Sequence, residues 1–322
     1  MKEILKKIKK YHTIIIHRHD NPDMDALGSQ LGLKYALKNK FKDKEIYAVG
    51  DMNRFSFIGK MDEISDDKYQ DALVIICDVA VGKMVSDKRY FLAKEVVVID
   101  HHKNECNLSL DDQEFIKPLY KFVRNDLVAC AEIITMLLTN WKIDIPKEAA
   151  TALYGGMVTD SGRFQYGNNL AHSFEMAAIL MKHGADAQYI YKNLYVESLN
   201  DRKMKNYFQS KMQLTSDNVA YMINEKDVFD LFNVDTFTVS RGMVNLMAGI
   251  EGINIWANFT YDRISGKYFG EFRSRDIAIV DVAKKYGGGG HENACGATLE
   301  KEQIEMILND FNQLAKEFKK NA

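Results

Sequence analysis

Three short apolar segments near the amino end of the chain are each followed at once by acidic or histidine residues. They are TIIIHRH (13–19), ALVIICDVA (72–80) and EVVVIDHH (95–102), and a weaker strand, EIYAVG, covers 45–50. Near-continuous Val and Ile runs are typical of parallel strands buried on both faces. The segment 25–40 has apolar residues at helical spacing, so strand and helix alternate. The pattern predicts an α/β domain with a doubly wound, mainly parallel sheet.

The remaining chain predicts a helical stretch followed by a smaller α+β domain. Helices are expected over 127–141, 146–160, 171–184, 241–252, 279–287 and 301–318, with a connecting helical segment over 186–213. Further strands are expected over 218–224, 253–262 and 266–274. The length of 322 residues favours two domains. We therefore expect a first, α/β domain (1–195), a helical linker (196–215) and a smaller second domain (216–322).

Composition and charge exclude several classes of protein. The net charge of −2 gives no basic surface for long nucleic acid, although a few local cations suffice for a short ligand. No apolar run approaches the roughly 20 residues that a membrane span needs, and the Lys-rich start MKEILKKIKKYH does not resemble a signal peptide. The scattered cysteines at 77, 106, 130 and 295 are expected to be reduced thiols. We expect a cytoplasmic protein without membrane association.

Acidic and histidine side chains are grouped at the carboxyl ends of the predicted strands, where open α/β sheets bind ligands. The groups, in chain order, are His19 with Asp23 and Asp25, then Asp78, then Asp100 with His101 and His102, and finally Asp160 at the end of a helix. Arg163 follows three residues after Asp160. Asp25 has an alternative interpretation as the cap of the helix that follows it.

Four of these carboxylates are expected to converge: Asp23, Asp25, Asp78 and Asp160. Without cations they would repel each other and raise each other's pKa. Carboxylate and imidazole donors without thiolate favour Mn²⁺, Mg²⁺ or Fe²⁺ over a structural zinc. One bridging carboxylate would place two ions ~3.5–4 Å apart, as in two-metal hydrolases.

A glycine-rich segment near the carboxyl end, residues 268–297, predicts an anion and nucleotide clamp. Gly287 to Gly290 allow the backbone to approach a ligand closely, and His291 follows them. Arg273 and Arg275 are one alternation apart, so both can face one side of a strand and bind phosphate. The alternative is a flexible loop beside an exposed edge. No Gly-Lys-Ser/Thr follows, which excludes a Walker loop.

Taken together, five motifs resemble the DHH phosphoesterase family with its C-terminal DHH-associated domain. These motifs are HDNPDMDALGS, CD, DHH, VTDSGRF and FRSR…GGGGHENACGA, and the resemblance covers essentially the whole chain. Length and motif order are similar to those of the nanoRNase type, which also dephosphorylates 3′-phosphoadenosine 5′-phosphate. The resemblance implies a hydrolase that depends on two divalent metal ions, with Mn²⁺ favoured and Mg²⁺ or Fe²⁺ as alternatives.

The resemblance also implies a role for each matching position. His19 and Asp23 would hold one ion, whereas Asp25, His101 and Asp160 would hold the other. Asp78 would bridge the two ions. Asp100 would orient a metal-binding histidine, and His102 would face the scissile phosphate. The residues expected to hold the substrate's terminal phosphate and nucleoside are Arg273, Ser274, Arg275, Gly288, Gly289, Gly290 and His291.

The implied substrates are short RNA oligomers, cleaved to nucleoside 5′-monophosphates, and 3′-phosphoadenosine 5′-phosphate, converted to AMP. A pocket for about two to five nucleotides needs local arginines rather than a basic stripe, in agreement with the charge. Metal-activated water would be the nucleophile, so no protein nucleophile is expected. The general acid and the role of Arg163 are left open. A homodimer is consistent with the resemblance.

Other functions stay open as alternatives. A phosphodiesterase for cyclic dinucleotides, or for linear dinucleotides such as pApA and pGpG, ranks second because such relatives usually carry sensory and membrane segments. An inorganic pyrophosphatase would carry a Ser-Arg-Lys-Lys type of anion site, and a single-strand DNA exonuclease would be longer. A non-catalytic nucleotide-binding or RNA-binding module is disfavoured because every metal-ligand position is filled.

Overall fold

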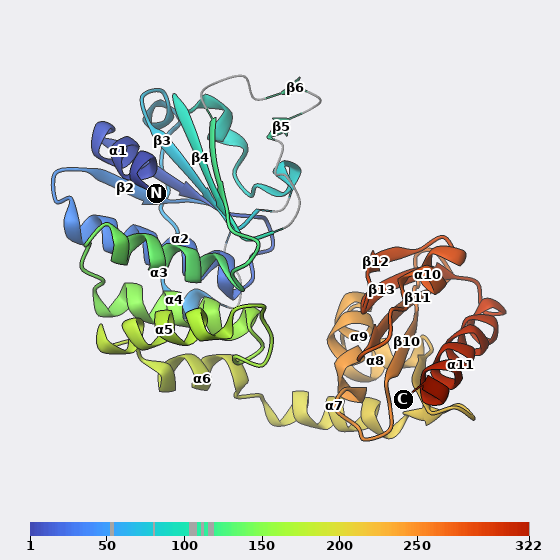
Figure 1. The fold of residues 1–322 in the computed structure, drawn as a ribbon. Helices are drawn as coiled ribbons and strands as arrows, with labels where there is room; N and C mark the ends of the chain where they lie inside the picture. The colour runs from blue at the N-terminus through green and yellow to red at the C-terminus, as the bar shows by residue number, and fades with distance from the viewer. Residues whose placement is uncertain (52–54, 80, 103–107, 111–112, 115–118, 322) are drawn as a thin grey trace. The chain divides into compact units, whose positions relative to one another are not determined.

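The computed structural model describes residues 1–322 except 52–54, 80, 103–107, 111–112, 115–118 and 322. The chain forms two compact units, Met1–Val196 and Glu197–Ala322 (Figure 1). Across the described residues, no helix has the length and apolar character needed to cross a membrane. Cys106 lies outside the described residues, and Cys77, Cys130 and Cys295 are free and buried.

The first unit is built on a five-stranded sheet in which every pairing is parallel, in the order β2-β1-β3-β4-β7. The strands are β1 (Thr13–His17), β2 (Glu45–Ala48), β3 (Leu73–Cys77), β4 (Glu95–Asp100) and β7 (Leu119–Val123), and β5 (Ser109–Leu110) pairs with β6 (Gln113–Glu114) separately. This confirms the predicted parallel α/β sheet. The prediction missed β7 because this strand is exposed at its ends and lacks a continuous Val and Ile run.

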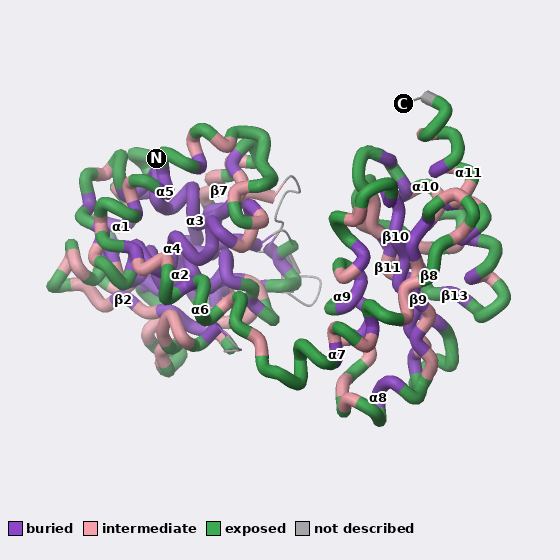
Figure 2. Tube along the Cα trace, turned by 90° about the horizontal axis from the view of Figure 1, so that it is seen from below, coloured by how far each residue is buried: buried purple, intermediate pink, exposed green. Residues whose placement is uncertain are grey.

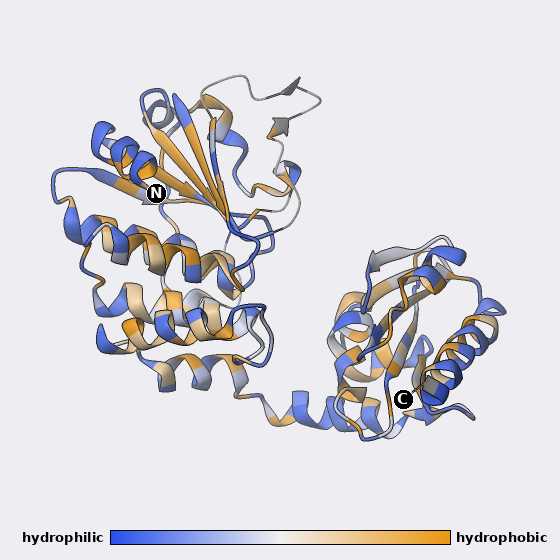
Figure 3. Cartoon of the chain, in the orientation of Figure 1, coloured by the Kyte–Doolittle hydropathy of each residue, from blue (hydrophilic) through white to orange (hydrophobic). Residues whose placement is uncertain are grey.

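Both faces of the sheet are buried at its central strands β1, β3 and β4, which explains their continuous apolar runs. Along β1, Ile14 and Ile16 pack into the core beneath the helices, whereas Ile15 packs into a second core on the opposite face. These three strands are correspondingly hydrophobic along most of their length (Figure 3). Because neither of their faces meets water, their polar residues are confined to the strand ends.

Helices cover one face of this sheet in successive layers, and short 3₁₀ turns cover the other (Figure 1). The helices are α1 (Lys2–Lys10), α2 (Met24–Lys40), α3 (Cys130–Asn140), α4 (Lys147–Asp160), α5 (Leu170–Lys182) and α6 (Ala187–Tyr195). The 3₁₀ turns are η1 (Ser56–Ile58), η2 (Asp66–Tyr69), η3 (Gly82–Met84) and η4 (Lys88–Leu92). Helix α2 is buried along most of its length, as the tube in Figure 2 shows.

The single helical segment expected over 186–213 is interrupted. Helix α6 ends at Tyr195, and α7 (Leu199–Ser210) starts after Ser198. The side chains of Ser198 and Asp201 form a reciprocal capping box, which satisfies backbone N–H groups at the start of α7. The Ser-x-x-Asp spacing is visible in the sequence, so this signal could have located the break.

The second unit contains a six-stranded mixed sheet in the order β12-β13-β11-β10-β9-β8. Among the described residues, β9 and β10 pair in parallel and every other pairing of this sheet is antiparallel. The strands are β8 (Gln213–Leu214), β9 (Val219–Asn224), β10 (Ile255–Tyr261), β11 (Tyr268–Ser274), β12 (Gly289–His291) and β13 (Ala294–Leu299). Besides α7, the helices are α8 (Asp227–Phe232), α9 (Thr236–Met243), α10 (Val280–Lys285) and α11 (Gln303–Asn321), with the 3₁₀ turn η5 (Val244–Met247). This confirms the predicted α+β architecture.

Two details of this unit differ from the sequence-based expectation. The helix expected over 241–252 starts earlier, as α9, and gives way to η5, which ends at Met247. Gly289–His291 forms the edge strand β12 instead of a loop, and it pairs with β13. Glycine is uncommon in strands, so the sequence of this segment does not indicate a strand. Only its pairing with β13 identifies it as one.

The two faces of the second sheet are covered unequally. On one face, α10 and α11 pack along the sheet, with the rings of Phe272 and Phe311 5.1 Å apart. On the other face, α9 and its neighbours pack against Ala220, Met222 and Trp256 of β9 and β10. The parts of β11, β13 and β12 beyond α9 line a hollow on this second face.

A close helix contact in the first unit gives a stability test. A Cβ atom added at Gly28 of α2 would lie 2.4 Å from the carbonyl oxygen of Ala152 in α4. We expect Gly28→Ala to lower the free energy of unfolding by about 1–3 kcal/mol, because backbone must move to relieve this contact.

Gly242→Ala in helix α9 is the control, since its new Cβ would meet no atom within 4 Å. Urea unfolding followed by circular dichroism compares the two variants. A cost for Gly242→Ala equal to or above that for Gly28→Ala would contradict the proposed contact.

Candidate functional site

The carboxyl ends of three neighbouring strands meet at one edge of the parallel sheet. His17 of β1 pairs with Ile76 of β3, and Cys77 of β3 pairs with Ile99 of β4. His19, Asp78 and His101 follow these strands within two residues. Asp78 has a positive φ of 57°, which is uncommon outside glycine and marks a sharp change of chain direction at the end of β3.

Helix α2 adds two carboxylates with different tasks. Asp23 is the cap of α2, since its side chain accepts a hydrogen bond from Ala26 N at 2.9 Å. Asp25, in the first turn, is fully buried and accepts from Cys130 N at 2.7 Å and Ala131 N at 2.9 Å. These donors begin α3, so the interpretation of Asp25 as the cap of its own helix is wrong. It binds the start of α3 instead, where helix N–H groups favour an anion.

The structure brings all six predicted metal ligands together in two groups. The groups are His19 with Asp23 and Asp78, and Asp25 with His101 and Asp160, and in each the donor atoms lie within 4.8 Å of one another. Asp78 connects the groups, because its Oδ2 lies 3.6 Å from His19 Nε2 and its Oδ1 lies 3.3 Å from His101 Nε2. The assignment of each residue to an ion stays a prediction.

The electrostatics of these groups reflect crowded, buried acids. Burial, with a further contribution from Asp78, raises the pKa of Asp25 to about 7. Burial and the neighbouring Asp25 also raise the pKa of Asp160. Burial alone would raise the pKa of Asp78, but the adjacent rings of His101 and His19 outweigh it and lower this pKa.

For His19 and His101, the surroundings favour the charged form of the ring. Although burial lowers the pKa of an imidazole, Asp23 and Asp78 raise the pKa of His19 to about 10. Asp78 and Asp25 likewise raise the pKa of His101 to about 10. In protein without bound cations, the two rings therefore carry the positive charge that the carboxylates require.

Donor chemistry and unsatisfied atoms both fit divalent cations at this place. Asp78 Oδ1 and His101 Nε2 are buried and have no hydrogen-bond partner of good geometry among the described residues. Buried polar atoms without partners are rare and call for an explanation such as an ion. A set of carboxylates and imidazoles without thiolate suits Mn²⁺, Mg²⁺ or Fe²⁺.

Asp100 contacts a different histidine ring from the one that the resemblance implies. Its Oδ1 lies 2.8 Å from Nδ1 of His102 and accepts from the backbone N of His101 at 2.8 Å. Asp100 therefore orients His102, the residue expected to face phosphate, and contacts His101 through the backbone. The bond to Asp100 is also the main cause that raises the pKa of His102.

Arg163 follows the site in a turn of unusual backbone. Gly162, Arg163 and Phe164 have consecutive positive φ angles of 55°, 64° and 62°. Such angles are uncommon for non-glycine residues and are maintained by the surrounding packing. The guanidinium carbon of Arg163 lies 5.3 Å from the centre of the Tyr195 ring. This cation–π contact is the partner that the structure gives to Arg163.

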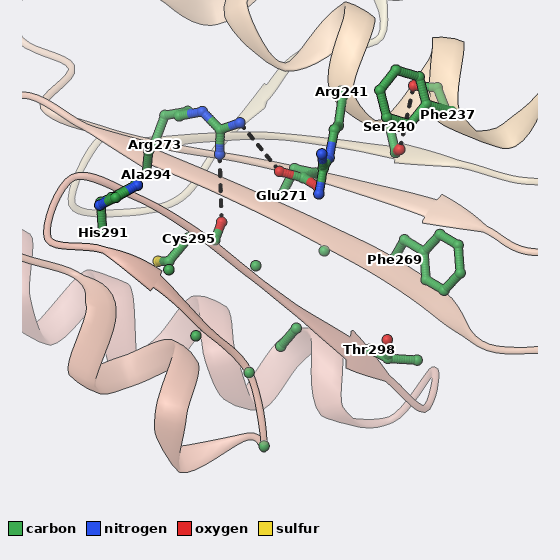
Figure 4. A pocket seen from close by; sticks show the side chains of 17 residues that line it. Phe237, Ser240, Arg241, Phe269, Glu271, Arg273, His291, Ala294, Cys295 and Thr298 are labelled. Atoms are coloured by element: carbon green, nitrogen blue, oxygen red, sulfur yellow. Dashed lines mark hydrogen bonds and ion pairs between the residues drawn. The ribbon is translucent and has the colours of Figure 1, made fainter. Parts of the chain in front are cut away.

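The second unit has a hollow of about 910 Å³ on the uncovered part of its sheet (Figure 4). Of the residues expected to hold substrate, Arg273, Gly288, Gly289, Gly290 and His291 line it. Cβ atoms added at Gly288 and Gly290 would lie 2.1 Å from Gly296 O and 2.6 Å from Ala294 O. The close approach of β12, and of Gly288 just before it, to β13 therefore requires glycine at these two positions.

Ser274 and Arg275, the other two residues expected there, are not among the described residues that line the hollow. Ser274 Oγ donates to Ile277 O at 2.5 Å. The Arg275 guanidinium donates to Ile250 O at 3.4 Å and Ile253 O at 3.3 Å. Strand β11 ends at Ser274, so alternation no longer controls the direction of Arg275.

Sequence reasoning missed several residues of the hollow. Phe269 and Glu271 alternate with Arg273 along β11 and face the same side. Phe237 and Arg241 reach the hollow from α9 (Figure 4). The alternation of β11 could have identified Glu271 and Phe269, whereas no local signal connects α9 to this strand.

The sequence is similar to two known domain families. Residues 13–157 match the DHH family, N-terminal domain, and residues 232–317 match the DHHA1 domain. The chain is also 36% identical over 317 residues to a bifunctional oligoribonuclease and PAP phosphatase NrnA of Mycoplasma genitalium, covering 96% of this chain and 95% of the relative. A Bacillus subtilis protein of the same name is 32% identical, covering 98% of each chain.

A solved structure has the same arrangement of elements. The exopolyphosphatase-related protein from Bacteroides fragilis matches with a TM-score of 0.80 at 23% identity, covering 98% of this chain and 97% of that one. At this level of identity the match shows a common fold and nothing more specific.

The raised histidine pKa values give a test by pH. Between about pH 7 and 10, the folded protein freed of metal by a chelator keeps protons on His19 and His101 that the unfolded chain, with its ordinary histidine pKa near 6.5, has lost. Since the folded state then binds more protons, the free energy of unfolding should fall as pH rises, by at most about 1.4 kcal/mol per pH unit for each histidine.

Urea unfolding in the presence of chelator, at pH 7, 8, 9 and 10, measures this slope. His101→Asn, which cannot be protonated in this range, is the control and should flatten the slope. Identical slopes in the two proteins would show that His101 does not carry the raised pKa.

Proposed function

Because the chain belongs to the DHH phosphoesterase family, it is a hydrolase, and we propose that it cleaves short oligoribonucleotides and dephosphorylates 3′-phosphoadenosine 5′-phosphate. The products would be nucleoside 5′-monophosphates and AMP. The names and the near-complete coverage of the relatives support this choice of substrates. The cytoplasmic location and the homodimer expected from the sequence stay predictions.

The observation that carries the proposal is the position of Asp78 between two ligand groups. Each of its carboxylate oxygens faces a different histidine, as a bridging ligand requires. Enzymes of this family depend on divalent metal, and we propose Mn²⁺ as the ion for this chain. His19 and Asp23 would hold one ion, and Asp25, His101 and Asp160 the other. Bound ions of this kind supply Lewis-acid polarisation and a nucleophilic water at neutral pH.

His102 would contact the phosphate that is cleaved. Its side chain is 39% exposed, and Nδ1 is engaged by Asp100, which leaves Nε2 to face a substrate. Because Asp100 raises the pKa of this ring, His102 is readily protonated and can offset negative charge that develops on the phosphoryl oxygens.

Besides its proposed role as a metal ligand, Asp25 accepts hydrogen bonds from the start of α3 and so holds that helix against the site.

The hollow of the second unit would bind the end of the substrate that carries the terminal phosphate. Arg273 supplies a guanidinium for a terminal phosphate. The glycine strand leaves its backbone accessible, and a Cβ atom added at Gly289 would meet no atom within 4 Å. His291 and the aromatic residues Phe237 and Phe269 complete a surface suited to a nucleoside.

A substrate panel in Mn²⁺ tests the proposed function. The panel contains di- to pentaribonucleotides, 3′-phosphoadenosine 5′-phosphate, cyclic dinucleotides and pyrophosphate. We expect turnover of the first two classes and loss of it on chelation. Asp78→Ala should lower kcat by about a thousandfold or more, since both ligand groups share this residue. Preferred hydrolysis of cyclic dinucleotides or pyrophosphate would refute the assignment, as would an inert wild type.

The two adjacent histidines should separate metal binding from turnover. His101→Ala should weaken Mn²⁺ binding, because His101 faces Asp78 and Asp160 at 3.3 and 3.5 Å. His102→Ala should retain Mn²⁺ and lower kcat by about 10²–10³. Calorimetric Mn²⁺ titration and steady-state kinetics compare the variants. His102 also lies within reach of Asp78, so equal metal loss in both variants would assign His102 to a metal.

A further inference from the structure

A carboxylate connects two arginines in the hollow of the second unit. Glu271 Oε1 lies 2.9 Å from Arg241 Nε, and Glu271 Oε2 lies 3.2 Å from Arg273 Nη2. The three side chains come from α9 and β11 and converge in the view of Figure 4. Each carboxylate oxygen is thus committed to a different guanidinium.

The two arginines differ in how firmly they are held. Arg273 is 22% exposed and also donates to Phe272 O at 2.8 Å, so its guanidinium is fixed at the sheet. Arg241 is 62% exposed and lies with its guanidinium carbon 5.3 Å from the centre of the Phe237 ring. Arg241 therefore projects from α9 into the hollow, and no described residue accepts a hydrogen bond from its two terminal nitrogens, which leaves them available for a ligand.

The charge of this cluster suits a small anion. Two guanidiniums face one carboxylate, and two positive charges less one negative leave one positive charge. Glu271 is only 14% exposed, so its carboxylate lies at the base of the cluster with little access to water. An anion that approaches from solvent would meet the outer N–H groups of both arginines and the repulsion of Glu271 behind them.

We propose that Arg241 and Arg273 form a two-arginine clamp for the substrate's terminal phosphate, and that Glu271 is an internal counter-anion that weakens it. This inference rests on the proposed function, since it names how the hollow selects the end of a nucleotide. Glu271 holds both guanidiniums through one carboxylate oxygen each and offsets half of their charge. It thereby reduces the affinity for phosphate, so that a monophosphate product is released readily.

A stabilising role alone does not account for the cluster. Exposed ion pairs contribute little to stability, and Arg241 lies on the exposed side of a short helix. Recognition of a base by the Glu271 carboxylate is the main alternative. It predicts that loss of the charge weakens every ligand, with or without a terminal phosphate.

The full-length protein is tested in Mn²⁺ with one diribonucleotide in two forms, with a 5′-phosphate and with a 5′-hydroxyl. The readout is the ratio of the KM for the phosphorylated form to the KM for the hydroxyl form. Arg241→Gln should raise this ratio about tenfold, because a charged hydrogen-bond partner of the phosphate is lost. Glu271→Gln should lower it about fivefold, because the repulsion is removed while the shape is kept.

Glu300→Gln is the matched control, since Glu300 pairs with Lys267 at 2.7 Å in the same unit and does not line the hollow. It should leave the ratio unchanged. Calorimetric binding of AMP and of adenosine to the same four proteins repeats the comparison without turnover. Far-ultraviolet circular dichroism verifies that each variant is folded.

The outcomes separate the inference from the proposed function. If the wild type is inactive on both dinucleotides, the proposed function fails, and AMP binding still decides whether Glu271→Gln tightens and Arg241→Gln weakens the clamp. If the wild type is active but Glu271→Gln raises both KM values equally or leaves the ratio unchanged, the counter-anion role is wrong. An unchanged ratio in Arg241→Gln would remove Arg241 from the clamp.

Discussion

The burial of several carboxylates at one sheet edge is the constraint on which the first unit depends. Asp25 and Asp78 are almost completely inaccessible to solvent, and Asp160 lies beside Asp25. A buried charge is unfavourable unless partners compensate it. The backbone N–H groups at the start of α3 serve Asp25, and the rings of His19 and His101 serve Asp78. The position of α3 and the direction of three strand ends follow from these contacts.

In the second unit, the hollow depends on what α9 leaves uncovered. Helix α9 packs over β9 and β10, and Phe269, Glu271 and Arg273 of β11 line the hollow beside it on that face. The opposite face needs Phe272 and its neighbours for packing against α11. One strand therefore contributes alternately to a core and to the lining of the hollow, as the period of two residues requires.

Strands β1, β3 and β4 were predictable because their apolar runs are a direct consequence of burial on both faces. Strands β7 and β12 were not, since one is partly exposed and the other consists mainly of glycine. Their pairing partners lie elsewhere in the chain and define them as strands. The same limit applies to Arg275, whose direction is determined by the end of β11 and by distant carbonyl groups.

The sequence by itself determined the parallel sheet, the residues gathered at its carboxyl edge and the chemical class of the donors. These features are local, because a run of Val and Ile followed by an acid or a histidine has one physical interpretation in such a fold. Only the tertiary structure decided that Asp25 binds the start of α3, that Asp100 orients His102 and that Arg241 shares Glu271 with Arg273. Each of these contacts depends on packing and backbone direction, which local periodicity does not encode. The contacts of Asp25 and Arg241 also join residues that are far apart in the chain.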